Sequence, residues 1–406
     1  MNLQIDSNDN QVLGAGILNG VSVVDTLNGL SNYHYLECNN NSSNEIKQYR
    51  GIIKAQDGSI VCRSLGFTPE VDESNEEEMM SIVKPFLEGD VKAFLSYEST
   101  LLRVYFHKDD NDVGGWYIST FRKIDAFKSK WGGSKSFGQL FEECLNIPSS
   151  EEQNVLSRKP LQEWCENNLN RATQYCYIIR TYNENRIVCT GYDKPEIFLV
   201  GTWGLQGFDL DECKVPRCLD ELSTVEDIKK HLSNLDHNAV QGLILFNSKG
   251  ESVKVMKHEY VEAFKLRGNQ PNILLRYIEL QQEGVEERVK SFFEMYPEHQ
   301  ETIITFTEVI QDICSFMFRK YRNRFIRKQV AIVPPDLYYI IRELHDAYLK
   351  DRTKIVTPER VSDYVHTLPP LKLLGLFNSY NKRKNEFGNG NKLSKEFMDK
   401  VKAMIM

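Results

Sequence analysis

The sequence lacks the marks of several large protein classes. It has no run of about 20 apolar residues, so it offers no membrane-spanning helix. Its nine cysteines are scattered without a short paired framework, which indicates reduced thiols in a cytosol-like compartment. Residues 1–10 are polar and acidic, which argues against a signal peptide. These absences predict a soluble cytoplasmic protein.

A net positive charge is also missing. The 57 acidic and 50 basic residues leave a formal charge of −7, so a general nucleic-acid coat is excluded and any such contact needs a local patch. Cys213 and Cys218 form one loose pair without a second pair at ligand spacing, which argues against a zinc site. What remains is an ordinary globular composition over 406 residues, enough for one large or two medium domains.

Strand-like patterns dominate the first 280 residues. Residues 49–54 and 59–64 flank Gln56-Asp57-Gly58, which predicts a hairpin. Residues 91–98 and 100–106 predict two paired strands. Further strands are predicted at 116–120, 175–181, 186–190, 197–200, 240–246 and 252–256, and helices at 136–145 and 161–168.

From about residue 285 the sequence pattern becomes typical of helices. Helices are predicted at 285–296, 301–327, 336–350 and 358–368. The composition shift therefore predicts an α+β domain over residues 1–280 and a helical domain over residues 281–406.

The order of the strand motifs resembles that of a known family. The motifs are Tyr49-Arg50-Gly51, Tyr97-Glu98-Ser99-Thr100-Leu101-Leu102-Arg103, Asn185-Arg186-Ile187-Val188, Gln241-Gly242-Leu243-Ile244 and Val253-Lys254-Val255-Met256. They are similar to motifs of the covalent nucleotidyltransferases, specifically the bacteriophage RNA ligase 1 type and the ligase-like proteins of large DNA viruses. The resemblance implies a nucleotidyltransferase domain, with ATP-grasp-like antiparallel sheets and flanking helices, followed by an all-helical domain.

The resemblance also implies a chemistry. In an active member, a lysine amine attacks the α-phosphate of ATP with Mg²⁺ present, and the lysyl-AMP then serves RNA end joining. That lysine lies in a Lys-x-Asp/Glu-Gly pattern, but the matching stretch here reads Ser96-Tyr97-Glu98-Ser99. Gln241 and Met256 stand where a metal-side glutamate and a second lysine are expected. The nucleophile is thus missing from its expected position.

Other positions still match the family. The residues expected to bind nucleotide are Arg50, Glu98, Arg103, Lys123 and Lys254, and Asn185 and Arg186 match as well. ATP and Mg²⁺ would be the cofactors of an active protein, and no dedicated metal site is predicted.

Two lysines are candidates for a displaced nucleophile. Lys92 lies four residues before Ser96, on the same face of a regular strand, and Lys54 lies in a Lys-x-x-Asp-Gly stretch. The alternatives are a solvated strand lysine and a plain hairpin turn. Lys257 is a further substitute for the missing second lysine, if a bulge precedes it.

The densest positive charge lies in the helical region. Six cations occur in residues 319–328, and on a helix Lys320, Arg324, Arg327 and Lys328 share one side. Together with Arg319 they are predicted to contact the phosphate backbone of RNA. The alternative is that they pair with acidic groups of the same protein.

Three functional hypotheses follow. The favoured one is a ligase-like pseudoenzyme that binds RNA, nucleotide or a viral protein partner. The second is an active ATP-dependent RNA ligase that uses a displaced lysine. The third is a viral structural or assembly protein that uses the fold as a scaffold.

Overall fold

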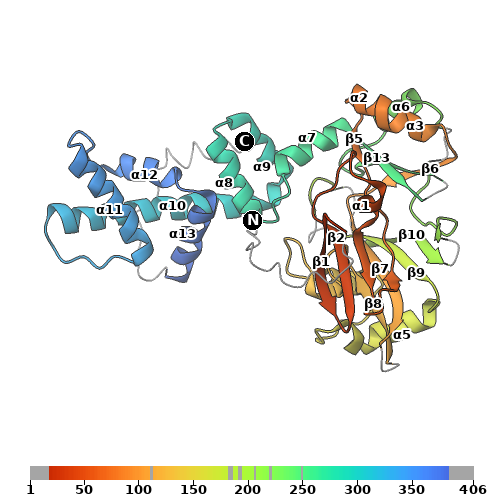
Figure 1. Ribbon diagram of the computed structural model, residues 1–406. Coiled ribbons are helices and arrows are strands. Elements are labelled where there is room, and N and C mark those ends of the chain that lie inside the picture. Colours follow the sequence, from red (N-terminus) through yellow and green to blue (C-terminus); the bar gives the residue numbers. More distant parts are fainter. Residues whose placement is uncertain are drawn as a thin grey trace. The chain divides into compact units, whose positions relative to one another are not determined.

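The computed structural model describes residues 18–109, 113–181, 186–190, 194–204, 207–218, 222–247 and 250–383. The chain divides into two compact units, Met1–Lys265 and Leu266–Met406. Every described strand belongs to the first unit, drawn in red to green in Figure 1, and the second unit is helical. The prediction of an α+β protein with antiparallel sheets and a helical carboxyl-terminal region is thus confirmed.

The first sheet is an antiparallel meander. Its strands are β1 (Val21–Leu27), β2 (Leu30–Tyr35), β3 (Arg50–Lys54) and β4 (Ile60–Cys62), with the short helix α1 (Asn44–Gln48) before β3. The hairpin predicted around Asp57-Gly58 is confirmed, because β3 pairs with β4. Gly51 has a φ of +90°, and a Cβ there would lie 2.5 Å from the carbonyl oxygen of Phe121. Glycine therefore allows the Phe121 loop to approach β3.

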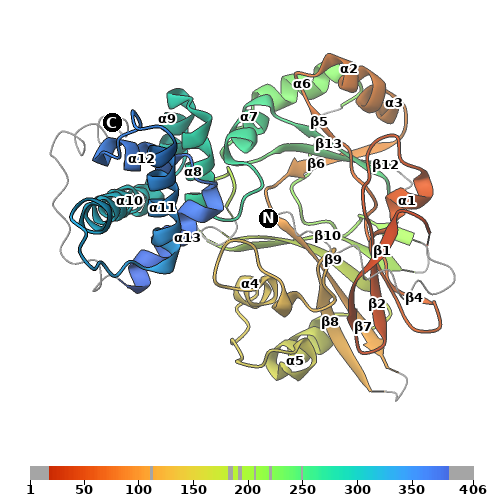
Figure 2. The ribbon, with the colours of Figure 1, turned by 60° about the vertical axis from the view of Figure 1, so that its left-hand side comes forward.

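The second sheet is antiparallel, with five strands. In spatial order these are β11 (Gly207–Asp209), β10 (Glu196–Gly204), β9 (Gln174–Arg180), β7 (Thr100–Lys108) and β8 (Gly114–Ser119). The helices α4 (Phe137–Cys144) and α5 (Lys159–Asn168) lie along one side of it (Figure 2). Leu102, Trp116, Phe141 and Leu161 belong to the core that these elements share.

The third sheet has helices on one face. Its order is β5 (Glu70–Asp72), β13 (Ser252–Met256), β12 (Gly242–Asn247) and β6 (Val91–Ser96), with β5 and β13 parallel. The segments α2 (Glu76–Glu78), η1 (Met79–Val83), α3 (Lys84–Leu87) and α6 (Val225–Ser233) lie beside it in Figure 2.

Alternating strand residues separate the two faces of the third sheet. Leu243, Leu245 and Val253 pack with the helices, whereas Phe94 and Phe246 pack with residues of the second sheet. This alternation is what a strand with two buried faces requires. The apolar layer between the second and third sheets is where the candidate site lies.

Two strand predictions were wrong. β6 and β7 do not pair, because the chain crosses from the third sheet to the second at residues 97–99. Arg186–Thr190 forms no strand. Its backbone amides bind a buried carboxylate instead, an interaction that strand propensity cannot report.

The helical unit follows α7 (His258–Arg267), which spans the division between the units. Its elements are α8 (Ile273–Glu283), α9 (Glu286–Met295), η4 (Pro297–His299), α10 (Gln300–Tyr321), the π-helical turn η5 (Arg322–Ile326), α11 (Pro335–Lys350), α12 (Pro358–His366) and α13 (Pro370–Lys382). The four predicted helices are confirmed, and α8 and α13 were missed. None of the described helices is long and apolar enough to cross a membrane.

The division between the units lies earlier than the composition shift suggested. Residue 280 falls inside α8, whose Leu274, Tyr277 and Ile278 are buried in the helical core. Because α8 contributes its apolar face to that core, it belongs with the second unit.

Candidate functional site

A cavity of about 180 Å³, here called the first cavity, is lined by residues of the second and third sheets. Arg50, Ser96, Gln241 and Lys254 all line it. Its apolar wall includes Phe94, Leu101, Ile178, Val200 and Phe246. The structure thus brings together four positions that the sequence singled out from segments up to two hundred residues apart.

Ser96 begins a series of hydrogen-bonded polar groups, of which all but the half-buried Gln241 are buried. Its side chain is 3% exposed, and its hydroxyl donates to Oε1 of Gln241 at 3.2 Å. Nε2 of Gln241 donates to the hydroxyl of Tyr260 at 2.8 Å, and that hydroxyl donates to Oε2 of Glu98 at 3.2 Å. Burial, followed by the charge of Glu98, raises the pKa of Tyr260 well above its ordinary value. The Ser96 hydroxyl therefore donates to a neutral amide and not to a base.

Glu98, the last group of this hydrogen-bonded series, has a structural role. It is 4% exposed, and the backbone amides of Ile187, Val188 and Cys189 donate to its carboxylate, the latter two at 2.7 and 3.1 Å. Four donors satisfy most of the lone pairs of a carboxylate. Glu98 holds residues 187–189 in place and is not among the residues that line the first cavity.

Arg103 and Lys123 are also engaged elsewhere. The Arg103 guanidinium is completely buried and donates to the carbonyl oxygens of Gly51 and Thr120. Lys123 lies 3.0 Å from a carboxylate oxygen of Asp25 on β1. Neither residue lines the first cavity, and Asn185 lies outside the described residues.

Arg50 and Lys254 are the cations of the first cavity. Nη1 of Arg50 donates to the Gly66 carbonyl at 3.3 Å, and its guanidinium lies 4.4 Å from the Phe121 ring centroid. Lys254 pairs with Glu70 at 3.1 Å, and its charge lowers the pKa of Glu70. No Asp or Glu is among the described residues that line the cavity. An apolar wall with two cations suits an anion that carries an apolar body.

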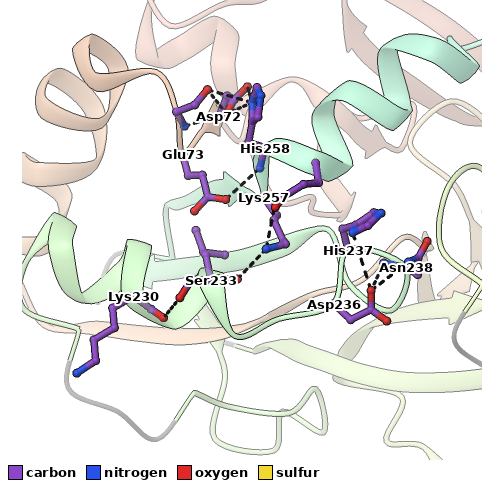
Figure 3. A network of polar contacts seen from close by, with 12 residues as sticks. Asp72, Glu73, Lys230, Ser233, Asp236, His237, Asn238, Lys257 and His258 are labelled. Atoms are coloured by element: carbon purple, nitrogen blue, oxygen red, sulfur yellow. Dashed lines mark hydrogen bonds and ion pairs between the residues drawn. The ribbon is translucent and has the colours of Figure 1, made fainter. Parts of the chain in front are cut away.

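The displaced lysines lie away from the first cavity. Lys92 pairs with Asp211 at 3.2 Å, and Lys54 lies on β3, 5.3 Å from the Tyr33 ring centroid. Lys257 is buried and donates to the Leu232 carbonyl at the end of α6, at 3.2 Å (Figure 3). Among the described lining residues, Lys254 is the one lysine.

A divalent cation finds few donors in this lining. Mg²⁺ in nucleotide sites is held by one or two carboxylates and by phosphates, whereas this lining offers a glutamine where the resemblance expects a glutamate. Within the described ranges, no group of three or more His, Cys, Asp and Glu side chains could hold a metal. The residues that line the first cavity therefore do not fit a protein-held Mg²⁺.

Sequence reasoning missed a polar cluster at the start of α7. Nδ1 of His258 lies 3.1 Å from a carboxylate oxygen of Asp72, and the Ser74 hydroxyl contacts both groups. The His258 amide donates to Glu73, as Figure 3 shows. Ser74 and Asp72 contact the same ring nitrogen, whereas in a Ser-His-Asp triad the hydroxyl and the carboxylate contact different ones, so these three side chains do not have the arrangement of a triad. The cluster fixes the beginning of α7.

The cations of the helical unit form a surface at the end of α10. We define the cationic surface as Arg319, Lys320, Arg322, Arg324, Arg327 and Lys328. Five of these side chains are exposed, and Lys320 is half-buried. In the part of the chain that the structure describes, none of the six pairs with a carboxylate. The alternative of internal ion pairing therefore finds no support among the described residues.

Aromatic rings are what the cationic surface contacts instead. Lys320 lies 5.1 Å from the Phe316 ring centroid, and Arg324 lies 5.0 Å from that of Tyr338. Exposed cations beside aromatic rings are the combination found in sites for single-stranded nucleic acid.

Comparison with known proteins finds viral relatives. The chain is 25% identical over 335 residues to an immediate-early protein ICP-46 homolog of Invertebrate iridescent virus 3, covering 80% of this chain and 71% of that protein. It is 26% identical over 329 residues to the homolog of Invertebrate iridescent virus 6, covering 76% and 70%. No protein-family model matches the chain.

Solved structures that overlap with this chain include RNA ligases. A mutant RNA ligase of Naegleria gruberi overlaps with a TM-score of 0.31 and 14% identity, covering 50% of this chain and 58% of the ligase. An archaeal ATP-dependent RNA ligase overlaps with a TM-score of 0.34 and 9% identity, covering 89% and 76%. The chain thus spans little more than half of the Naegleria ligase, and overlaps this low carry no functional inference.

Proposed function

We propose that this protein is a ligase-like nucleotidyltransferase of the bacteriophage RNA ligase 1 type that has lost self-adenylylation. In this proposal it binds a nucleotide in the first cavity and RNA on the cationic surface. The observation that carries the proposal is the hydrogen bond between the buried Ser96 and the half-buried Gln241. Where the resemblance expects a lysine and a glutamate, the chain has two neutral side chains that are hydrogen-bonded to each other.

The neutral pair leaves the first step of the reaction, attack on the α-phosphate of ATP, without a nucleophile at the expected position. A serine hydroxyl is a weak nucleophile unless a base takes its proton. The partner of Ser96 is an amide oxygen, which cannot act as that base. Lys254 remains in the lining, but its amine is held in an ion pair with Glu70 at 3.1 Å and does not contact Ser96 or Gln241 in that pairing.

A protein that has lost self-adenylylation can still bind a nucleotide. In the proposal, phosphate groups meet Arg50 and Lys254, and the base meets Phe94, Ile178 and Phe246. The volume of about 180 Å³ is below the roughly 300–1,000 Å³ of common ligand sites, which favours part of a nucleotide over a whole triphosphate.

Incubation with α-labelled ATP and Mg²⁺ tests the loss of self-adenylylation. A denaturing gel at neutral or alkaline pH should show no covalent AMP label on the chain. A stoichiometric AMP adduct would overturn the proposal in favour of the active-ligase alternative. Mass spectrometry would then assign the adduct to Lys92, Lys54 or Lys254.

Equilibrium binding of labelled AMP and ATP tests the retained site. Arg50→Ala and Lys254→Ala should each weaken nucleotide binding. Lys159→Ala, an exposed lysine at the start of α5, is the matched control and should bind like the unaltered protein.

RNA binding is supported by the six cations that lack carboxylate partners among the described residues. The viral relatives favour a viral protein, for which the host cytoplasm or the virion is the expected location. The scaffold alternative, a viral structural or assembly protein, predicts neither nucleotide nor RNA binding.

A further inference from the structure

A second cavity in the first unit is larger than the first. It holds about 480 Å³, which lies within the roughly 300–1,000 Å³ of ligand sites. Leu65 lines both cavities. Phe67 lines the second cavity and Thr68 the first, so the segment between β4 and β5 contributes to both cavities.

Aromatic side chains line the second cavity. Phe67, Phe86 and Trp203 contribute to it, and all three are half-buried, so part of each ring is accessible. Trp203 also contacts Phe208, with ring centroids 5.2 Å apart and 46° between the ring planes. Stacking of a base on such a ring does not depend on base identity, because every base has a π face.

Arg63 supplies a cation beside the indole. Its side chain is exposed, and its guanidinium lies 6.0 Å from the Trp203 ring centroid. No carboxylate pairs with it among the described residues.

The backbone that carries this pair is held firmly. The side-chain amide of Gln174 accepts from the Arg63 amide at 2.7 Å and donates to the Arg63 carbonyl at 2.8 Å. Gln174 is also the strand partner of Trp203 across β9 and β10. A single residue thus links the cation and the indole, and both are presented by fixed backbone.

The remaining charges of the lining are few. Lys47 donates to the Asn40 carbonyl at 2.7 Å, and Glu251 accepts from the Asn247 side chain at 2.8 Å. Two cations against one carboxylate favour an anionic ligand.

We propose that the second cavity binds a nucleotide unit of single-stranded RNA, with its base against Trp203 and its phosphate at Arg63. This inference rests on the proposed function, in which RNA is the partner. Because Leu65 lines both cavities, RNA seated here lies beside the first cavity.

Binding and crosslinking with an oligouridylate of about six nucleotides tests this proposal. Arg63→Ala and Trp203→Leu should each weaken binding by about fivefold or more, as expected for the loss of one stacking or phosphate contact. The control Lys159→Ala should not. Ultraviolet irradiation should crosslink the RNA to the peptide that contains Trp203.

Competition by free uridine monophosphate distinguishes a site for single nucleotides from a site that requires an RNA strand. If it competes with the crosslink, the cavity accepts single nucleotides, and if only the oligomer crosslinks, the cavity requires a strand; both outcomes support the site. Unchanged RNA affinity in Arg63→Ala together with no crosslink at Trp203 would overturn it. Arg63 is exposed, so its variant stays informative even if Trp203→Leu unfolds.

Nucleotide binding in the first cavity is measured separately on the same variants. A crosslink at Trp203 in a protein that binds no AMP or ATP would refute the nucleotide part of the proposed function and leave the second cavity standing. The reverse result would refute the second cavity alone.

Discussion

The two units use their charged residues in opposite ways. In the first unit, Glu98 and Arg103 are buried and hydrogen-bonded to backbone groups of the same unit. In the helical unit, Arg324 and Arg327 are exposed and lack carboxylate partners among the described residues. A charged residue in a motif therefore indicates binding only where the fold leaves its charge available.

The physical reason lies in the cost of burying charge. An ionised group inside a protein must be hydrogen-bonded or paired, so buried charges become parts of the fold. A cluster of exposed like charges instead repels itself, and that repulsion is relieved when an anion binds.

Glu98→Ala should destabilise the first unit by about 3–5 kcal/mol, because it leaves buried amide donors without an acceptor. Chemical denaturation of the full chain measures the change. Glu163→Ala, at an exposed position of α5, is the control and should change stability by less than about 0.5 kcal/mol. A small effect at Glu98 would mean that this carboxylate is available for ligand binding after all.

Reversal of Lys320, Arg324 and Arg327 to Glu should weaken RNA binding by about 100-fold, since several phosphate contacts become repulsive. The loss should be similar for unrelated RNA sequences, because phosphate contacts carry no base information. Fluorescence anisotropy at a series of salt concentrations measures both the loss and the salt slope.

Thermal unfolding of the same triple variant decides between RNA binding and internal pairing. No ion pair among the described residues is broken, so the midpoint should stay near that of the unaltered protein. A clear drop in the midpoint with unchanged RNA affinity would assign these cations to internal pairing. The two units would then not differ in how they use their charged residues.

Ser96→Lys should destabilise the first unit by about 2 kcal/mol, because an ammonium placed in this buried position meets a neutral amide. Adding Gln241→Glu should recover part of that loss, since the two side chains are in contact. A double-mutant cycle by chemical denaturation measures the coupling. Additive effects would show that the two neutral residues are not a matched pair.

The smallest effect concerns two histidines with opposite shifts. Hydrogen bonding and the charge of Asp72 raise the pKa of His258 above its ordinary 6.5. Its stabilising contribution is thus complete below the unfolded value and is lost as pH rises through the raised folded value. Burial lowers the pKa of His345, so its contribution is present above the unfolded value and is lost as pH falls.

Denaturation of His258→Gln and His345→Gln between about pH 5 and pH 8 measures these contributions. The advantage of the unaltered protein over His258→Gln should shrink as pH rises. Its advantage over His345→Gln should grow. Equal slopes for both variants would contradict the assigned shifts.

Much of the fold could be predicted from local patterns. The hairpin at Asp57-Gly58, the hairpin of β12 and β13, and the helix at residues 301–327 depend on residues that are close in sequence. The strand predicted at 186–190 was wrong because its apolar residues resemble a strand, while its amides bind Glu98 from another segment.

The candidate site, like the fold, could be predicted from the sequence only in part. The sequence by itself determined that no lysine stands at position 96 and that six cations lie in residues 319–328. It could not determine which of the matching charged residues line the first cavity. Arg50 and Lys254 line the first cavity, whereas Arg103 and Lys123 do not.

Only the tertiary structure decided how distant residues combine. The contact between Ser96 and Gln241 joins positions 145 residues apart, and the second cavity combines Arg63 with Trp203 through Gln174. Composition and periodicity describe neighbours along the chain. Hydrogen bonds across packed sheets depend on register and on which faces meet, and these are set when the whole apolar core assembles.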